Sequence, residues 1–378
     1  MKIALSLLCE NPRRKTGLTT TYHEFVARSL KLFPDLSWVV FAGPNQDWQV
    51  NDARVEVVRD FPANDRIVRR LLADHFQVPA VARARGADVL ISTGFVPIRK
   101  SLTTVMHVFS LQHLDKSNRI GLAREFYRRF ITHYSWPKAD LVITNSKFAL
   151  SQILSVFPDF GSRTVQAYEG LQHEQFHPAR ATGETERLHS ETGLKPGYFL
   201  WLSNFYAYKQ PELMITAYAG LDPGTRSRHP LIMVGGEWGT TQAECREQAR
   251  ALGVAEDVKF LGWVKDDMLA PLYRHALAHV MPSREETFGR TVIESMASGT
   301  PCVVNDIPIM REVTEGHALI VDFKDGPRAT AALRQIANDE QVRVALRDAG
   351  LKRAAHFTFE KFTSERIVAI QRLLSRNK

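Results

Sequence analysis

One stretch decides the fold of this chain: Pro282-Ser283-Arg284-Glu285-Glu286-Thr287-Phe288-Gly289-Arg290-Thr291-Val292-Ile293-Glu294. A β-like run ends just before it, so Glu286 falls in the loop that leaves a strand, and Glu294 falls about two turns into the helix that follows. Amides at the start of such a helix lack intrahelical acceptors, and the helix dipole favours anions there. The stretch therefore predicts a strand–loop–helix unit that binds a ligand with hydroxyl and phosphate groups. The carboxylates would accept hydrogen bonds from the hydroxyls, and the amides would donate hydrogen bonds to the phosphate. The amides expected to face this ligand are those of Thr287, Phe288, Gly289 and Arg290.

Short apolar runs alternate with helical patterns on both sides of this stretch. At 378 residues, the chain also exceeds what one hydrophobic core usually supports. Because β-branched runs bounded by turn residues suit parallel strands buried on both faces, we predict two doubly wound α/β domains. The expected strands are 3–8, 38–42, 55–58, 89–92, 103–106, 141–145, 198–202, 231–234, 258–261, 279–281, 302–305 and 319–321. The expected helices are 20–32, 67–84, 121–136, 211–220, 241–252, 268–276, 290–298 and 359–374.

A polar segment with several turn-forming residues marks the change between the two domains. It includes His177, Pro178 and Gly183. The expected parts are a first domain over 1–175, a linker over 176–196, a second domain over 197–355 and a last helical segment over 356–378.

The opening stretch also carries a family resemblance. Glu286 to Glu294, with Phe288-Gly289 between them and Gly299-Thr300-Pro301 after them, resembles the Glu-x7-Glu signature of retaining glycosyltransferases of family 4. The resemblance extends over nearly the whole chain and is sharpest over 198–304. It implies a GT-B fold, in which the parallel sheets of two Rossmann-like domains face each other across a cleft and the last helix packs back onto the first domain. An amphipathic helix with solvated carboxylates is the alternative interpretation.

The resemblance implies a role for each residue of the donor site on the second domain. Glu294 would bind the ribose hydroxyls of a nucleotide-diphospho-sugar. Glu286, as a catalytic residue, would hold the sugar together with the amides of residues 287–289. Lys209 and Arg290, at the start of the helix, would stabilise the departing diphosphate.

Lys209 belongs to a segment that resembles the family's Gly-Arg-x5-Lys diphosphate loop. It stands in the lysine position, just before a helix that Pro211 begins. Ser203 and Asn204 stand where the family has glycine and arginine, so Lys209 is expected to carry more of the charge neutralisation. An ordinary surface lysine is the alternative.

Two signals in the first half concern the sugar and the acceptor. Gly17 lies in a loop where the family has a glycine near the donor diphosphate or the acceptor, although a plain capping loop would look the same. His107 follows an expected strand at the edge where open α/β sheets bind ligands, and the resemblance makes it a catalytic-site residue beside the sugar. His113 is the competing candidate, and a histidine with structural partners is the alternative for both.

Glycine turns at two strand ends of the second half resemble the family segments that surround the nucleotide base. The residues concerned are Gly235, Trp263 and Val264. Because such contacts are made mainly by backbone, they leave the base undetermined, and ordinary turns would look alike.

The charge and composition of the chain limit the classes of molecule that it is expected to bind. The net charge is +8, but the basic residues are dispersed and no nucleic-acid-binding motif is present. Basic, apolar stretches at 66–72 and 119–130 make an anionic membrane surface a candidate partner, with solvated helix faces as the alternative.

Three scattered cysteines indicate neither a disulfide framework nor a metal site. No apolar run reaches the ~18 residues of a spanning helix and no signal peptide is expected, so we expect a cytoplasmic protein that could be peripheral at the inner face of the membrane.

The resemblance implies a retaining, metal-independent transferase that moves a mannosyl or other hexosyl group from a GDP- or UDP-sugar to a saccharide or lipid-linked saccharide of a surface polysaccharide. No Asp-x-Asp motif is present, and neither a metal nor a cofactor is expected. A sugar-nucleotide epimerase of related fold would use the nucleotide site without an acceptor. A non-catalytic nucleotide-binding scaffold would explain the charge but not the carboxylate pair.

Overall fold

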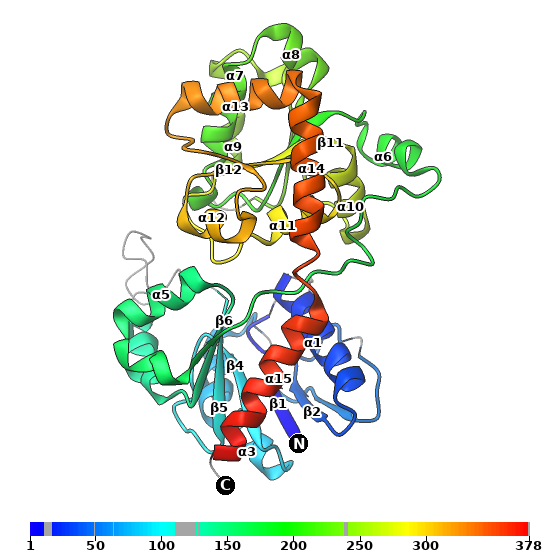
Figure 1. Cartoon of the computed structure of the whole chain (residues 1–378). Coiled ribbons are helices and arrows are strands. Elements are labelled where there is room, and N and C mark those ends of the chain that lie inside the picture. The colour runs from blue at the N-terminus through cyan, green and yellow to red at the C-terminus, as the bar shows by residue number, and fades with distance from the viewer. Residues whose placement is uncertain are drawn as a thin grey trace. The chain divides into compact units, whose positions relative to one another are not determined.

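A computed structural model describes residues 1–10, 17–48, 50–62, 64–109, 126–127, 129–237 and 241–376 of the chain. The chain forms two compact units (Figure 1). Unit 1 combines Met1–Gly170 with Phe359–Lys378, and unit 2 is the continuous segment Leu171–Thr358. Unit 2 is therefore inserted into unit 1, which is built from both ends of the chain.

A seven-stranded parallel sheet forms the centre of unit 1, in the order β3-β2-β1-β4-β5-β6-β7. The order reverses between β1 and β4, and open α/β sheets bind ligands outside the carboxyl ends of strands at such a switch point. The strands are β1 (Lys2–Ser6), β2 (Ser37–Phe41), β3 (Val55–Val58), β4 (Val89–Thr93), β5 (Thr103–Val108), β6 (Leu141–Thr144) and β7 (Thr164–Gln166).

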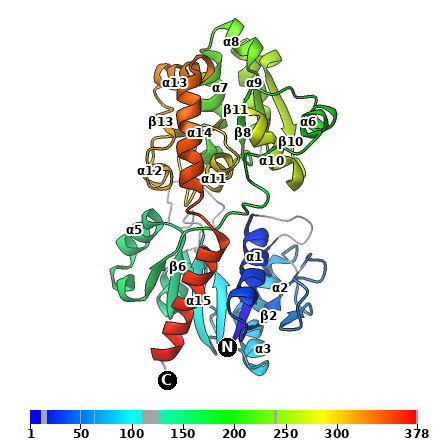
Figure 2. The same cartoon turned by 45° about the vertical axis from the view of Figure 1, so that its right-hand side comes forward.

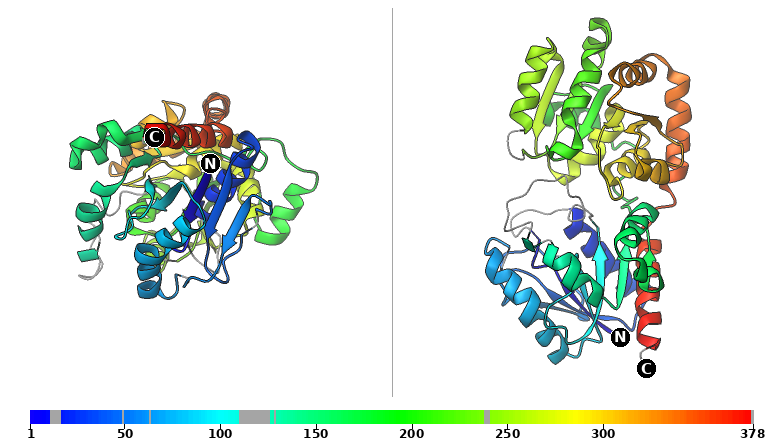
Figure 3. Two further views of the ribbon diagram at one scale, coloured as in Figure 1. Left: turned by 90° about the horizontal axis from the view of Figure 1, so that it is seen from below. Right: turned by 90° about the vertical axis from the view of Figure 1, so that its left-hand side faces the viewer.

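Helices cover both faces of this sheet because successive side chains of a strand point to opposite faces. Ile3 and Leu5 join the apolar cluster that includes residues of the helices at 17–32 and 359–376, whereas Ala4 joins the cluster that includes residues of the helical run 73–84. The view from below in Figure 3 shows these two layers. The helical elements are α1 (Gly17–Leu32), α2 (Ile67–Leu72), the π-helical η1 (Ala73–Gln77), α3 (Val78–Ala84), the π-helical η2 (Ile131–Ser135), η3 (Trp136–Lys138), α5 (Lys147–Val156), η4 (Pro158–Arg163) and α15 (Phe359–Arg376).

The last helix, α15, completes the core of unit 1. It lies alongside α1 (Figures 1 and 2). Its buried Arg366 donates to the backbone oxygens of Ala167 (2.9 Å) and Tyr168 (3.1 Å) and lies over the ring of Phe362. Burial lowers the pKa of Arg366 to about 9, and the carbonyl oxygens compensate its charge. Its apolar residues in the core are Phe359, Phe362, Ile367, Ala369 and Ile370.

Unit 2 repeats the architecture with a six-stranded parallel sheet, in the order β10-β9-β8-β11-β12-β13. Its order reverses between β8 and β11. The strands are β8 (Tyr198–Leu202), β9 (Leu231–Val234), β10 (Val258–Gly262), β11 (Ala276–Met281), β12 (Cys302–Asn305) and β13 (Leu319–Val321). The helical elements are α6 (Glu184–Thr192), η5 (Ala207–Lys209), α7 (Pro211–Ala219), α8 (Pro223–Arg228), α9 (Thr241–Ala251), η6 (Ala255–Asp257), α10 (Asp266–His275), α11 (Arg290–Ala297), α12 (Pro308–Thr314), α13 (Gly326–Asn338) and α14 (Glu340–Ala354).

The two doubly wound parallel-sheet domains predicted from the sequence are present. Five predicted strands, 55–58, 198–202, 231–234, 302–305 and 319–321, have the observed bounds, and the others differ by a few residues. The prediction missed the short edge strand β7 and the helices α5, α8, α12, α13 and α14. The expected helix 67–84 is continuous but contains the π turn η1, and the expected helix 121–136 lies partly outside the described residues.

The chain passes between the units at Gly170 and again at Thr358, compared with the expected boundaries at 175 and 356. The segment 176–196, expected as a linker, belongs to unit 2 and contains α6. Within the described ranges, no helix combines the length and apolarity needed to cross a membrane.

Candidate active site

Two loops meet at the switch point of unit 2. One leaves β8 and carries Lys209; the other leaves β11 and carries Glu286. Because β8 and β11 are neighbouring parallel strands, both loops start from the same edge of the sheet. The amide of Arg284 donates to the carbonyl oxygen of Tyr208 (2.8 Å), and Lys209 Nζ lies 2.5 Å from Glu286 Oε1. The Lys209 and Glu286 side chains are only 15% and 12% exposed, so the predicted diphosphate lysine and sugar carboxylate form one partly buried pair.

The loop that carries Glu286 is held at both ends. The side-chain amide of Asn305 donates to the carbonyl oxygen of Ser283 (3.1 Å). Phe288 is buried with its ring edge-to-face on Phe357 (5.5 Å between centroids). Gly289 has φ of 87°, a left-handed conformation that favours glycine, and it starts α11. Phe288 therefore anchors the loop, and Gly289 turns it into the helix.

Glu294 lies buried in the second turn of α11. Its Oε1 accepts from Arg290 Nε (3.0 Å), one turn earlier in the helix, and its Oε2 accepts from the Tyr273 hydroxyl (3.1 Å). Burial and the neighbouring carboxylate raise the pKa of Tyr273 far above its usual range, so the phenol stays protonated and donates. Tyr273 was not predicted as a site residue, because its place in an amphipathic helix looks like that of any core aromatic.

A buried histidine ties α11 to the sheet. Burial lowers the pKa of His279, in β11, to about 4, so its ring is neutral. Nδ1–H donates to the Leu200 carbonyl oxygen (3.2 Å), which leaves Nε2 to accept from the Thr291 hydroxyl (3.4 Å). The start of α11 is thus fixed relative to β8 and β11, the strands that position Lys209 and Glu286.

The residues predicted to contact the base, and those of the predicted diphosphate loop, follow the carboxyl ends of β8, β9 and β10. Asn204 Oδ1 accepts from the amide of Gly236 (3.1 Å). Gly235 has φ of 146°, and a Cβ atom there would lie within 1.8 Å of the Ser203 carbonyl oxygen. Only glycine permits this approach of the two loops. Asn204 and Gly235 therefore join the β8 and β9 loops, whereas Trp263 is exposed beside them and Val264 is half-buried.

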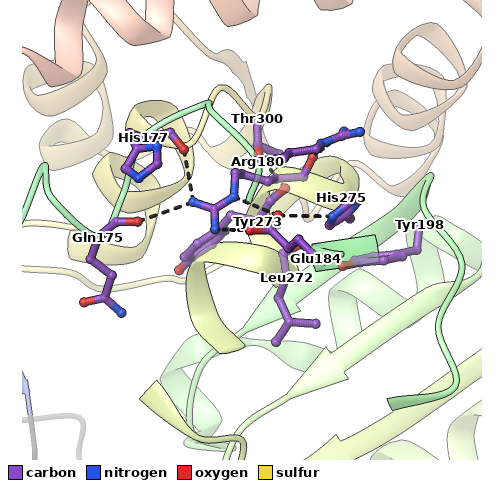
Figure 4. A network of polar contacts seen from close by, with 10 residues as sticks. Gln175, His177, Arg180, Glu184, Tyr198, Leu272, Tyr273, His275 and Thr300 are labelled. Atoms are coloured by element: carbon purple, nitrogen blue, oxygen red, sulfur yellow. Dashed lines mark hydrogen bonds and ion pairs between the residues drawn. The ribbon is translucent and has the colours of Figure 1, made fainter. Parts of the chain in front are cut away.

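A polar network that sequence reasoning missed lies behind Tyr273 (Figure 4). Arg274, at the end of α10, forms two hydrogen bonds with the buried carboxylate of Glu184 (2.9 and 2.5 Å). Arg274 also donates to the carbonyl oxygen of His177 (3.1 Å), and the Thr300 hydroxyl donates to that of Tyr273 (2.6 Å). Burial opposes ionisation of Glu184, but the hydrogen bonds and charge of Arg274 outweigh it and hold its pKa below the usual range. The network fixes the end of α10, from which Tyr273 reaches Glu294.

In unit 1, His107 lies within β5 and is only 1% exposed. Its Nδ1 lies 3.0 Å from the Tyr22 hydroxyl, which also lies 3.0 Å from Thr93 Oγ1. Burial, followed by the charge of Arg366, holds the pKa of His107 well below its usual range. Among the described residues, its Nε2 has no hydrogen-bond partner. The structure thus gives His107 a neutral ring at the carboxyl end of the sheet, held by Tyr22, which the sequence did not single out.

Two further residues were predicted in unit 1, Gly17 and His113, and the structure describes only Gly17. Gly17 is exposed and begins α1, and its carbonyl oxygen accepts from the Thr21 hydroxyl (2.8 Å). His113 lies outside the described residues, as does the loop immediately before Gly17. Over the described residues of both units, no group of three or more histidine, cysteine or acidic side chains could hold a metal ion.

Residues 184–353, less than half of the chain, match the family model described as "Glycosyl transferases group 1". The chain is similar to the O-antigen chain mannosyltransferase B of Escherichia coli, with 28% identity over 243 residues, or 64% of this chain and 63% of that protein. It is also similar to the D-inositol 3-phosphate glycosyltransferase of Actinosynnema mirum, with 30% identity over 244 residues, or 61% of this chain and 57% of that protein. The match thus spans about three fifths of the length of these relatives.

Solved structures are similar along nearly the whole chain. The sucrose-phosphate synthase of Thermosynechococcus elongatus has a TM-score of 0.77 at 18% identity and covers 99% of both chains. WaaG, a glycosyltransferase involved in lipopolysaccharide biosynthesis, has a TM-score of 0.74 at 14% identity and covers 97% of this chain and 98% of its own. Anabaena HepE in complex with UDP and glucose has a TM-score of 0.72 at 18% identity and covers 98% of this chain and 99% of its own. These likenesses confirm the predicted GT-B fold class of two Rossmann-like domains.

Proposed function

We propose that this chain is a retaining, metal-independent glycosyltransferase that moves a hexosyl group from a nucleotide-diphospho-sugar to a saccharide or lipid-linked saccharide. The observation that carries the proposal is the pair of Lys209 and Glu286 at the switch point of unit 2, with the buried Glu294 behind it in α11. The match of residues 184–353 to the group 1 glycosyltransferases supports it, since that region contains all three residues.

Each charged group would meet the part of the donor that suits it. Glu294 would accept hydrogen bonds from the ribose hydroxyls, because two protein donors leave a carboxylate with further acceptor capacity. Lys209 would exchange Glu286 for the diphosphate, with Arg290 and the start of α11 adding positive potential. Glu286, released from that pair, would hold the sugar hydroxyls with the amides of residues 287–289.

Cleavage of the sugar–phosphate bond moves negative charge onto the departing diphosphate. Fixed cations and a helix dipole at that place would stabilise the transition state more than the bound donor, which is the condition for catalysis. Departure of the diphosphate and attack by the acceptor hydroxyl on the same face of the sugar, with the hydroxyl proton passing to the departing diphosphate, would retain the anomeric configuration. We assign no nucleophile, and a contact of His107 with the sugar stays a prediction.

The names of similar proteins suggest the substrates. One relative is a mannosyltransferase of O-antigen chains, and the HepE structure contains UDP and glucose. We therefore propose a GDP- or UDP-hexose as donor, an acceptor in surface polysaccharide synthesis, and no metal or cofactor.

Nucleotide binding to the purified chain tests the site. UDP, GDP, dTDP and ADP would be compared by thermal shift, since a ligand at 100 times its dissociation constant stabilises the folded state by about 2.7 kcal/mol. We expect one of them to raise the melting temperature of the wild type. Glu294→Ala should weaken that binding by roughly 1–3 kcal/mol, because the ribose hydroxyls lose a charged acceptor.

Glu294→Gln, which keeps an acceptor for Tyr273, separates loss of charge from loss of folding, and Glu340→Gln is a control in an exposed helix turn. Unchanged affinity in both Glu294 variants would rule out the ribose assignment. Slow release of sugar from the shifting nucleotide-sugar in water is expected of a transferase, whereas a scaffold would bind it without hydrolysis.

A further inference from the structure

Residues 283–289, which we call the Glu286 loop, rest on side chains from later in unit 2. Phe288 packs edge-to-face on Phe357. Gly289 lies directly against the buried Met310 of α12, because a Cβ atom on Gly289 would collide with Met310 Cε. The position of the loop therefore depends on where α12 and Phe357 lie.

One buried arginine holds both of these supports. Arg353, in the last turn of α14, is only 7% exposed. Its Nε donates to the carbonyl oxygen of Val313 (2.7 Å), and its Nη2 donates to that of Glu312 (3.2 Å). Both carbonyls belong to the last turn of α12, where partners within the helix run out. The same guanidinium lies 4.7 Å from the centroid of the Phe357 ring, within the range of a cation–π contact.

The set of partners suits a guanidinium group. Besides the two carbonyls and the ring, Arg353 Nη1 lies 3.0 Å from Glu315 Oε1, whose side chain is 58% exposed. A guanidinium can meet these partners together because its N–H donors point in fixed directions in one plane. A lysine ammonium is a compact point charge on a flexible chain, so it could not cover the same set.

The backbone of Phe357 is fixed as well. Its carbonyl oxygen accepts from the amide of Leu171 (3.1 Å) and lies 3.1 Å from His173 Nε2. Phe357 thus stands on a fixed backbone, with its ring between Arg353 and Phe288. In the same region, α14 packs along α11, the helix that carries Glu294 (Figures 1 and 2).

We propose that Arg353 is a positioning residue for sugar transfer, which fixes the Glu286 loop through Phe357 and the end of α12. The inference rests on the function proposed above. Loss of the guanidinium would leave two carbonyl oxygens of α12 without their donor and release one face of the Phe357 ring. Glu286 and the amides of residues 287–289 would then be less well placed, and a contact to a reacting sugar requires precise placement.

Arg353→Lys, which keeps the charge, tests the proposal. We expect kcat for sugar transfer to fall about tenfold, because the sugar contacts are misplaced. The Kd of the nucleoside diphosphate should change less than about twofold, because Glu294 keeps its own partners, Arg290 and Tyr273. A general loss of structure would weaken both quantities together.

Phe357→Leu should reproduce this loss of transfer, because it removes the ring through which Arg353 acts. The double variant Arg353→Lys/Phe357→Leu should lose little more than either single variant, since both changes interrupt the same set of contacts. Fully additive losses in the double variant would contradict a shared path.

Hydrogen exchange follows the loop without reference to activity. Peptides that span 283–289 should exchange at least about tenfold faster in Arg353→Lys than in the wild type, whereas β8 should keep its protection. Equal exchange of the loop in both proteins would overturn the proposal.

Arg343→Lys is the matched control. Arg343 lies in the same helix, and its Nη1 donates in the same way to the carbonyl oxygens of Ile336 (2.7 Å) and Ala337 (3.2 Å) at the end of α13. Arg343→Lys and Glu315→Gln, which removes the exposed partner of Arg353, should both keep wild-type transfer and loop protection.

The outcomes separate this proposal from the function on which it rests. Wild-type transfer by Arg353→Lys, or an equal loss in Arg343→Lys, would overturn the role of Arg353. A folded wild type that neither binds a nucleotide nor transfers sugar would contradict the proposed function itself, and hydrogen exchange would still decide whether Arg353 holds the loop.

Discussion

Glu286 and Glu294 are one residue type in two different surroundings. Glu286 lies on a loop and pairs with a flexible lysine, whereas Glu294 is buried on a helix between an arginine and a tyrosine. A loop carboxylate can exchange its partner when a ligand arrives, and a buried one held from two sides keeps its position. The difference in surroundings supports the different roles proposed for the two residues.

Substitution of Glu286 separates these roles. Glu286→Gln should lower sugar transfer about 100-fold, because a charged contact to the reacting sugar is lost. Binding of the nucleoside diphosphate should stay the same or become tighter, because Lys209 no longer has a carboxylate partner in the empty site. Steady-state kinetics with the donor and calorimetry with the nucleotide measure the two quantities. Glu285→Gln, one residue earlier, is the matched control, and equal losses in transfer and nucleotide binding would contradict the sugar role.

The sequence was most informative about individual residues where a motif also determines backbone shape. Phe288 and Gly289 could be recognised because the turn into α11 requires a left-handed residue and an anchor. Tyr273 and Tyr22 could not be recognised, since their contacts join segments far apart in the chain and a buried tyrosine resembles any core aromatic. His107 was predicted as a site residue from its place at a strand end, a role that stays a prediction, and its burial could not be predicted.

At the scale of elements, the segment 176–196, which was expected as a linker between the two units, is packed on unit 2 through α6. The ion pair of Glu184 and Arg274 joins α6 to the end of α10, with both side chains less than a tenth exposed. His275 Nε2 lies 3.2 Å from the same carboxylate, but burial lowers the pKa of His275, so the ring is expected to add no charge at neutral pH.

Breaking this pair should destabilise unit 2 markedly. Glu184→Ala should lower the free energy of unfolding by about 3 kcal/mol, because Arg274 is left charged and buried. Glu184→Leu combined with Arg274→Met should recover much of that loss. Urea unfolding of the wild type, the single variants Glu184→Leu and Arg274→Met, and the double variant measures the coupling. Glu191→Ala breaks the exposed pair with Arg187 in the same helix and should cost less than about 1 kcal/mol. A similar small cost for Glu184→Ala would show that the pair is solvated.

Predictions of elements from the sequence succeeded where periodicity was strong and flanking turns were clear. The buried central strands were located within a few residues, whereas β7, with three half-buried residues, carries too little pattern. The helices α13 and α14 were missed although they are long. The π turn in the run 67–84 could not be read, because it depends on the burial of Asp74 and His75 against Ser6 and Tyr127.

At the scale of the molecule, the two units differ in how the chain builds them. Unit 2 is one continuous segment, whereas unit 1 needs both ends of the chain. At the crossing, Leu171 and Thr358 form a β-bridge, so the entry and exit of unit 2 lie side by side.

Truncation should therefore affect the units unequally. A chain that ends at Thr358 loses the five core residues of α15, of which the two phenylalanines and two isoleucines are each worth about 1.5–3 kcal/mol of burial, and unit 1 should lose its cooperative unfolding transition. The isolated segment 171–358 should keep a cooperative transition and nucleotide binding. Calorimetry and limited proteolysis check both outcomes. A chain that ends at Leu374 keeps the core residues and serves as control, and retention of both transitions by the chain ending at Thr358 would contradict the prediction.

The position of α15 also determines the order in which the protein can be completed during translation. Domains usually fold as they leave the ribosome, from the N-terminus onward, at about 5–20 residues per second. Here residues 1–170 must wait for α15, which is made only after the whole of the inserted segment. At those rates the delay is on the order of 10–40 s. During that interval the nascent chain displays the apolar face of its first sheet, and this makes the early segment a natural client for ribosome-associated chaperones.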